Sequence, residues 1–74
     1  AKKPIVIEVT GTTTSSGALL IPTAVINGTF LSAWGANTAY FIYRRDNDYF
    51  MVRDTNLNVV ASTGITIKVA YIPV

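Results

Sequence analysis

Residues 38–53 read TAYFIYRRDNDYFMVR, and this stretch decides the fold class. Two runs of mostly aromatic and aliphatic side chains, residues 38–44 and 49–53, flank a polar tetrapeptide at residues 45–48. Aromatic and β-branched side chains fit a pleated sheet, whereas aspartate and asparagine favour turns because their side chains hydrogen-bond to nearby backbone. The stretch therefore predicts a β-hairpin whose turn lies at residues 45–48.

The rest of the chain continues the β pattern on both sides of this hairpin. Threonine, valine and isoleucine supply 26 of the 74 residues, and no window carries the apolar spacing of an amphipathic helix. Turns are expected at the low-complexity stretch 11–17, at Asn27-Gly28 as a two-residue hairpin turn, and at residues 34–37, 54–58 and 62–64. Strand-like runs lie between them, at residues 5–10, 18–21 (resuming at 23–26 after Pro22), 29–32, 59–61 and 65–72.

These signals predict a single all-β domain over residues 1–74, a small antiparallel β-sandwich or barrel of six to seven short strands. The last strand alternates clearly, because four apolar side chains share one of its faces. They are Ile65, Ile67, Val69 and Tyr71.

The size and composition of the chain predict that oligomerisation completes this fold. A domain this short is marginal as a monomer, and the usual remedies are disulfides, a metal or association. Cysteine and histidine are absent and charged residues are only 14% of the chain, so we expect a homo-oligomer, with a trimer favoured. Both faces of the run 38–44 are apolar or aromatic, which fits a neighbouring subunit on one side. The alternatives are a central strand covered within one monomer and a surface solvated by threonine and asparagine.

The same inventory argues against catalysis. Without histidine or cysteine the common nucleophilic triads cannot form. The acidic residues are Glu8, Asp46, Asp48 and Asp54, and three of these four lie in expected turns. An Asp46-Asn47-Asp48 calcium loop would need glycine and glutamate where Met51 and Leu57 stand. We therefore expect no enzyme activity, no cofactor and no metal.

Binding chemistry gathers around the hairpin turn. Trp34 or Tyr49 could stack on a sugar ring while Asp46, Asn47 and Asp48 accept hydrogen bonds from its hydroxyls. The candidate contact residues are Trp34, Arg45, Asp46, Asn47, Asp48 and Tyr49, although Trp34 is expected to be buried at the bottom of the core.

Arginines interleaved with aromatic rings also suggest an alternative, an OB-like domain for single-stranded nucleic acid. The three arginines of this region, Arg44, Arg45 and Arg53, alternate with aspartates. Cross-strand Arg/Asp pairs are the favoured interpretation, so nucleic acid is an unlikely partner.

No apolar run approaches the roughly 20 residues of a membrane span, and the N-terminal residues contain no apolar stretch as long as that of a signal peptide. Membrane insertion is therefore not expected.

The two ends of the chain resemble a known class of viral domain. A strand leads into Gly-Thr-Thr-Thr-Ser-Ser-Gly at residues 11–17 and an Ile21-Pro22 step, and the chain closes on Gly-Ile-Thr-Ile-Lys-Val-Ala-Tyr-Ile at residues 64–72. This pattern resembles the C-terminal head or tip domains of tailed-bacteriophage fibre, baseplate and receptor-binding proteins.

The resemblance implies a non-enzymatic virion structural and host-attachment module. It would be a homotrimer that assembles with other virion proteins, and its distal loops would contact host-surface glycan or protein. The resemblance also implies synthesis in the host cytoplasm without a signal peptide, followed by assembly into the virion. The chain departs from the pattern in being very short for such a head, which puts direct receptor contact in doubt.

Overall fold

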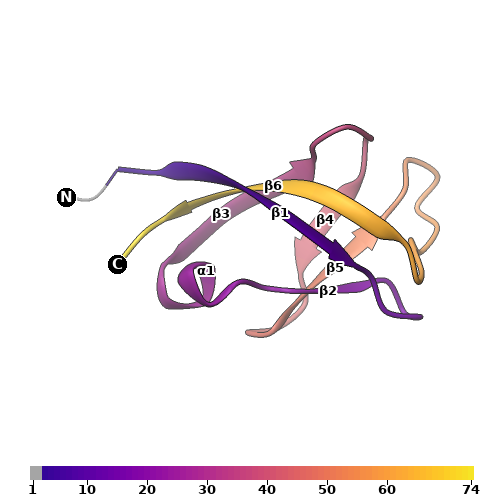
Figure 1. The fold of residues 1–74 in the computed structure, drawn as a ribbon, viewed down its shortest axis with the longest axis horizontal. Helices are drawn as coiled ribbons and strands as arrows, with labels where there is room; N and C mark the ends of the chain where they lie inside the picture. The colour runs from indigo at the N-terminus through magenta and orange to yellow at the C-terminus, as the bar shows by residue number, and fades with distance from the viewer. Residues whose placement is uncertain (1–2) are drawn as a thin grey trace.

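The computed structural model describes residues 3–74 and contains two small antiparallel sheets (Figure 1). One sheet has the strand order β1-β6-β3 and the other has the order β2-β5-β4. The predicted all-β fold is therefore confirmed, with six named strands and one short helix. In chain order the elements are β1 (Ile5–Thr12), β2 (Ala18–Leu20), α1 (Thr23–Asn27), β3 (Thr29–Gly35), β4 (Phe41–Arg44), β5 (Tyr49–Arg53) and β6 (Gly64–Ile72).

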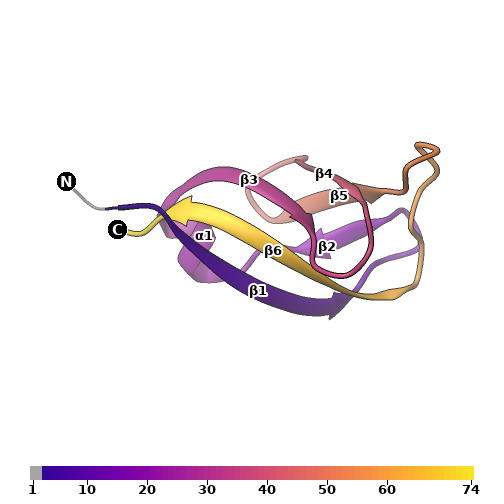
Figure 2. The same cartoon turned by 90° about the horizontal axis from the view of Figure 1, so that it is seen from above.

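The hydrophobic core lies between the two sheets, which form two layers in Figure 2. The four side chains predicted to share one face of β6 are all buried, as its alternation requires. From the opposite sheet, β5 contributes Phe50 and Val52, which have no exposed surface. The rings of Phe30 on β3 and Phe50 are 5.2 Å apart between centroids, so the core joins both layers.

The predicted hairpin is confirmed as β4 and β5. Arg44 pairs with Phe50, and the N–H of Arg45 donates to the carbonyl of Tyr49 at 3.0 Å, closing the turn. The first strand is shorter than the predicted run 38–44, because residues 36–40 carry the chain from the first sheet to the second. β4 is an edge strand with one solvent-facing side, so the alternative of a strand covered on both faces within one monomer is wrong.

The prediction of a strand at residues 23–26 with a hairpin turn at Asn27-Gly28 is wrong. These residues form α1, which Pro22 begins by accepting hydrogen bonds from the N–H groups of Val25 and Ile26. Burial of Val25 outweighs the weak strand preference of its side chain, because propensity is a small term beside packing. Gly28 ends the helix with a negative φ, and a Cβ there would collide with the carbonyl oxygen of Ile72.

Three further boundaries differ from those predicted. β1 continues to Thr12, and Thr13 is buried, where its N–H and hydroxyl both donate to the carbonyl of Thr63. β3 continues to Gly35, where a loop over residues 34–37 was expected. Residues 59–61 form no named strand and contribute only the bridge between Arg53 and Val59.

The predicted turn at residues 54–58 is confirmed. One oxygen of Asp54 accepts the N–H groups of Asn56 and Asn58, at 2.9 and 3.0 Å. Within residues 3–74, no helix has the length and apolar character that crossing a membrane requires.

Candidate binding surface

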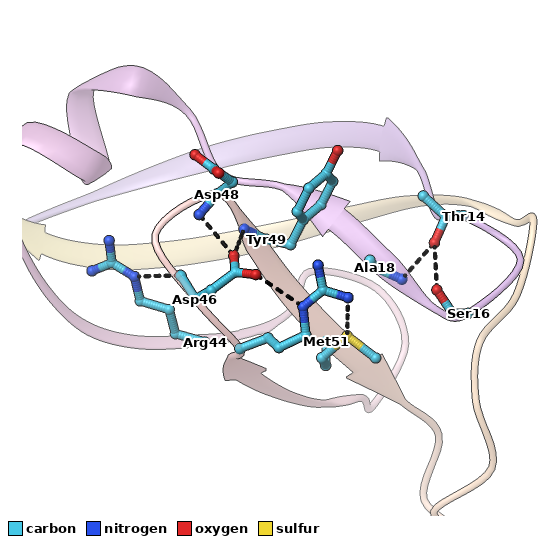
Figure 3. A network of polar contacts seen from close by, with 9 residues as sticks. Thr14, Ser16, Ala18, Arg44, Asp46, Asp48, Tyr49 and Met51 are labelled. Carbon is cyan, nitrogen blue, oxygen red and sulfur yellow. Dashed lines mark hydrogen bonds and ion pairs between the residues drawn. The ribbon is translucent and has the colours of Figure 1, made fainter.

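The β4–β5 turn is organised by the carboxylate of Asp46 (Figure 3). One oxygen, Oδ1, accepts the backbone N–H groups of Asp48 and Tyr49, both at 2.9 Å. The other, Oδ2, accepts from Nε of Arg45 at 3.1 Å, and Nε of Arg44 donates to the backbone carbonyl of Asp46 at 3.0 Å. An aspartate that accepts hydrogen bonds from the N–H groups two and three residues further on forms a local Asx turn, so the sequence itself selects this shape.

These contacts lower the pKa of the Asp46 carboxyl below its ordinary value of 3.8, first through the N–H of Asp48, then through the N–H of Tyr49, with a smaller part from Arg45. A lowered folded-state pKa means that the stabilisation is fully present above the unfolded value. It is lost as the pH falls through the folded-state pKa. We expect the amide resonances of Asp48 and Tyr49 to titrate together with a midpoint below 3.8. NMR spectra recorded against pH would measure this.

The matched control is Asp46→Asn, whose amide oxygen can still accept hydrogen bonds but carries no titrating carboxyl. In that variant the two amide resonances should no longer share the acid transition. A midpoint above 3.8 in the unmodified chain would contradict the turn geometry.

Arg45 turns away from the core and covers part of the outer side of the second sheet. Its guanidinium carbon lies 5.1 Å from the centroid of the Tyr49 ring, and its Nη1 is 4.0 Å from the sulfur of Met51. A guanidinium over an aromatic face is attracted by the ring quadrupole, so this contact helps to orient the Tyr49 ring.

Around this contact the outer side of sheet β2-β5-β4 is unusually apolar. Strand alternation sends Leu19, Phe50 and Val52 inward, so their neighbours point outward. Tyr49 is paired with Leu20 across the strands, and Met51 with Tyr43. Leu20, Phe41 and Tyr43 are 63%, 54% and 47% exposed. We call this surface the outer aromatic face; it consists of Leu20, Phe41, Tyr43 and Tyr49, together with Met51, which faces the same side but is only 9% exposed.

The structure brings five of the six predicted contact residues together and leaves the sixth apart. Arg45, Asp46, Asn47, Asp48 and Tyr49 are consecutive at the end of the hairpin. Trp34 lies on β3 of the other sheet, opposite Lys68 of β6, on the side that faces away from the core.

The expected burial of Trp34 is wrong, because its side chain is 39% exposed. Gly35 does not place the tryptophan in a loop. It allows the backbone at Thr38 to approach β3 closely.

The charges near the hairpin balance one another. Three arginines (Arg44, Arg45 and Arg53) accompany three aspartates (Asp46, Asp48 and Asp54), and Arg45 forms an ion pair with Asp46 at 3.1 Å. In the part of the chain that the structure describes, no three histidine, cysteine, aspartate or glutamate side chains group as metal ligands would. The chemistry offered here is therefore ring and aliphatic contact beside a neutralised arginine.

Sequence reasoning missed Leu20 as a surface residue. It lies in a short run before Pro22 that looks like an ordinary core strand, and only its pairing with Tyr49 places it on the outer aromatic face. The sequence did carry a signal for the rest of this surface. Residues 38–44 have apolar or aromatic side chains on both faces, which indicated that some of them, such as Phe41 and Tyr43, would not be covered within the monomer.

Comparisons of the chain with protein-family models, with curated proteins and with solved structures found no match.

Proposed function

We propose that this chain is a non-enzymatic assembly domain that forms a homotrimer through its outer aromatic face. The observation that carries the proposal is the exposure of Leu20, Phe41 and Tyr43 on the same side of one sheet, with Leu20 on β2 and the two rings on β4, across β5 from it. Single exposed apolar side chains are ordinary, but a contiguous group of large ones marks an interaction surface.

The energetics favour coverage of this face. Fully burying one large apolar side chain contributes about 1.5–3 kcal/mol. A standard interface buries roughly 800 Å² per partner, which is about a fifth of the 4404 Å² of accessible surface of the chain. A domain of this size therefore gains a large fraction of its total stability from association.

The charge distribution is compatible with a second copy as the partner. When identical subunits meet, an uncompensated charge on the contact surface would face its own kind. Arg45 already pairs with Asp46 on the same chain, and its guanidinium lies over the Tyr49 ring and close to the sulfur of Met51. Two such faces can therefore approach without bringing unneutralised Arg45 side chains together. Arg53, which is paired with Phe41 at the margin of this face, donates to the carbonyl of Leu57.

The wider role follows from the resemblance of the two ends of the chain to phage head and tip domains. We propose that the trimer is a structural and adhesion module of a tailed-phage fibre or baseplate, located in the virion beside other virion proteins. In that arrangement the turn residues Asp46, Asn47 and Asp48 are the part available for host-surface glycan or protein, because loops carry contacts that the packed framework cannot. Arg45 and Tyr49 border this turn but belong to the face that the trimer covers.

Single-stranded nucleic acid is a less favoured ligand for the same face. The contact of Arg45 with Tyr49 beside exposed rings is the arrangement that stacking platforms use. Such platforms also need net positive charge to follow phosphates, and here three aspartates offset three arginines.

The proposed trimer is tested by the double variant Phe41→Ser with Tyr43→Ser. Light scattering on the unmodified chain at low micromolar concentration should give three times the chain mass of 8.0 kDa. The double variant should give a monomer, because it removes two rings from the interface and none from the core.

The control is Leu31→Ser, which removes an equally exposed apolar side chain from β3 of the other sheet and should leave the trimer intact. A monomeric unmodified chain at these concentrations would refute the proposal.

A further inference from the structure

β1 is an edge strand with one charge, Glu8, and no other feature of those that usually protect an edge. Its one named partner among residues 3–74 is β6, so the opposite side of its backbone offers free N–H and C=O groups. Proteins commonly blunt such edges with short strands, bulges, proline or charge, because an open edge invites another strand. β1 runs for eight residues, contains no proline and pairs with β6 without a register shift.

The other edges of the molecule do carry such protection. β2 has three residues and β4 has four, ending at Arg44. β3, the other edge strand of its sheet, has a register irregularity between Phe30 and Ser32 and contacts β4. The open edge of β1 is therefore a specific feature of this strand.

The first half of β1 also leaves apolar side chains incompletely covered on both of its faces. Ile5 and Val6 are 42% and 55% exposed, and Ile7 and Val9 are only partly buried although they face the core side. The second sheet does not reach this end, because β2 lies against the far end of β1, where Leu19 approaches Gly11. Figure 1 shows this half of β1 extending away from β2.

We propose that β1 pairs antiparallel with β1 of a second copy, around a two-fold axis at Ile7, to join two β1-β6-β3 sheets into one. A strand added at this edge would satisfy the free backbone groups and cover the exposed apolar side chains at once. A two-fold axis is the natural symmetry, because two identical antiparallel strands present the same surface to each other.

The sequence of β1 selects the register. In a symmetric antiparallel pair one residue lies opposite itself, and the central candidates are Ile7, Glu8 and Val9. An axis at Glu8 would oppose two carboxylates, which is destabilising. An axis at Val9 would place Ile7 opposite Gly11, where there is no side chain to cover it, at the end that β2 already approaches. An axis at Ile7 instead places Ile5 opposite Val9 and moves Glu8 opposite Val6.

This contact is separate from the outer aromatic face, since the two lie on different sheets. It is also smaller. The stretch from Ile5 to Val9 extends over about 17 Å at 3.4 Å per residue, so it buries less than the roughly 800 Å² per partner of a standard interface. The edge pair is therefore a weak contact between one trimer and another, because a two-fold pair cannot lie between the subunits of a single cyclic trimer. Covalent trapping is the appropriate measurement.

The chain contains no cysteine, so a single substitution introduces its only thiol. In the proposed register, Ile7→Cys places two thiols opposite each other at a Cβ separation near that of a disulfide. Under mild oxidation the folded variant should form disulfide-linked dimers at least about tenfold faster than the same variant in urea, because pairing raises the local thiol concentration. Thr10→Cys, exposed on the same strand but far from its own copy in this register, is the control and should show no such acceleration.

A second measurement uses exposed positions that do not disturb the core, and it decides the question if Ile7→Cys fails to fold. An equimolar mixture of Val6→Cys and Glu8→Cys chains should give clearly more than the twofold excess of mixed dimer over each homodimer that random pairing produces, because these two positions oppose each other only with the axis at Ile7. Equal rates for folded and unfolded Ile7→Cys, or a mixed dimer no more than twice as abundant as each homodimer, would overturn the proposal. Adding Phe41→Ser and Tyr43→Ser to Ile7→Cys separates the two contacts, since the cross-link should persist when the trimer is lost.

Discussion

Replacing Phe50 with alanine is expected to remove most of the free energy of unfolding of the monomer. The Phe50 side chain has no exposed surface, lies in the middle of β5 and meets the ring of Phe30 from the other sheet. Removing a buried phenylalanine costs about 3–5 kcal/mol, because the transfer energy of the ring is lost and a cavity remains. A chain of 74 residues has a total stability of about 4–11 kcal/mol, with small domains toward the lower end. The substitution therefore removes most of it.

Urea unfolding followed by circular dichroism would measure this effect, at several protein concentrations because association adds to stability by mass action. Two variants serve as controls. Phe50→Leu keeps most of the volume and should cost less than about 1.5 kcal/mol. Phe41→Ala removes the same kind of ring from an exposed position, so it should change the concentration dependence of unfolding more than the stability of the monomer. A loss below about 1 kcal/mol for Phe50→Ala would contradict a core centred on this ring.

Gly35→Ala is expected to have the second largest effect, for a steric reason. A Cβ at position 35 would collide with the carbonyl oxygen of Thr38 and approach the Tyr40 ring to 2.9 Å. Backbone atoms cannot swing aside as a flexible side chain can, so the loop from β3 to β4 would have to shift. Forcing extra volume into a packed site costs about 1–3 kcal/mol, occasionally more. Because this loop carries the chain between the two sheets, its displacement would also disturb the start of β4.

The matched control for this variant is Gly64→Ala. Gly64 begins β6, and a Cβ there would meet no atom within 4 Å. The free energy of unfolding of the Gly64→Ala variant should differ from that of the unmodified chain by less than about 0.5 kcal/mol, as for ordinary surface substitutions. Comparing the two thermal midpoints therefore isolates the collision from the general effect of replacing a glycine. Equal midpoints for the two variants would show that the approach of Thr38 to Gly35 is not needed for stability.

Taken together, these variants separate three kinds of apolar residue. Phe50 stabilises the monomer, Phe41 and Tyr43 stabilise the proposed trimer, and Ile7 lies at the proposed edge contact. If one substitution affected all three measurements equally, folding and association would be a single process in this chain.

The sequence by itself determined those parts of the fold that depend on local chemistry. The hairpin formed by β4 and β5 followed from β-prone runs around a polar turn. Asp46 shapes that turn by accepting hydrogen bonds from the N–H groups of Asp48 and Tyr49. The alternation of β6 correctly identified the four core residues from Ile65 to Tyr71, because side chains in a strand point to opposite sides in turn. Such signals act within a few residues, so they can be recognised without knowledge of the partner strands.

Tertiary structure alone decided the features in which distant segments compete for the same space. Residues 23–27 became helical because Val25 fits the core from one turn of helix, although its branched side chain favours a strand. Gly28 is required by the carbonyl oxygen of Ile72, which lies far away in the sequence. Gly35 is required by the carbonyl oxygen of Thr38, on the loop that leads to the other sheet. Trp34 became a surface residue, and Leu20 joined Tyr49 on the outer aromatic face, through strand pairing. Which face of a strand is buried depends on which sheet it joins and what covers that sheet, and this information is not contained in any local window of sequence.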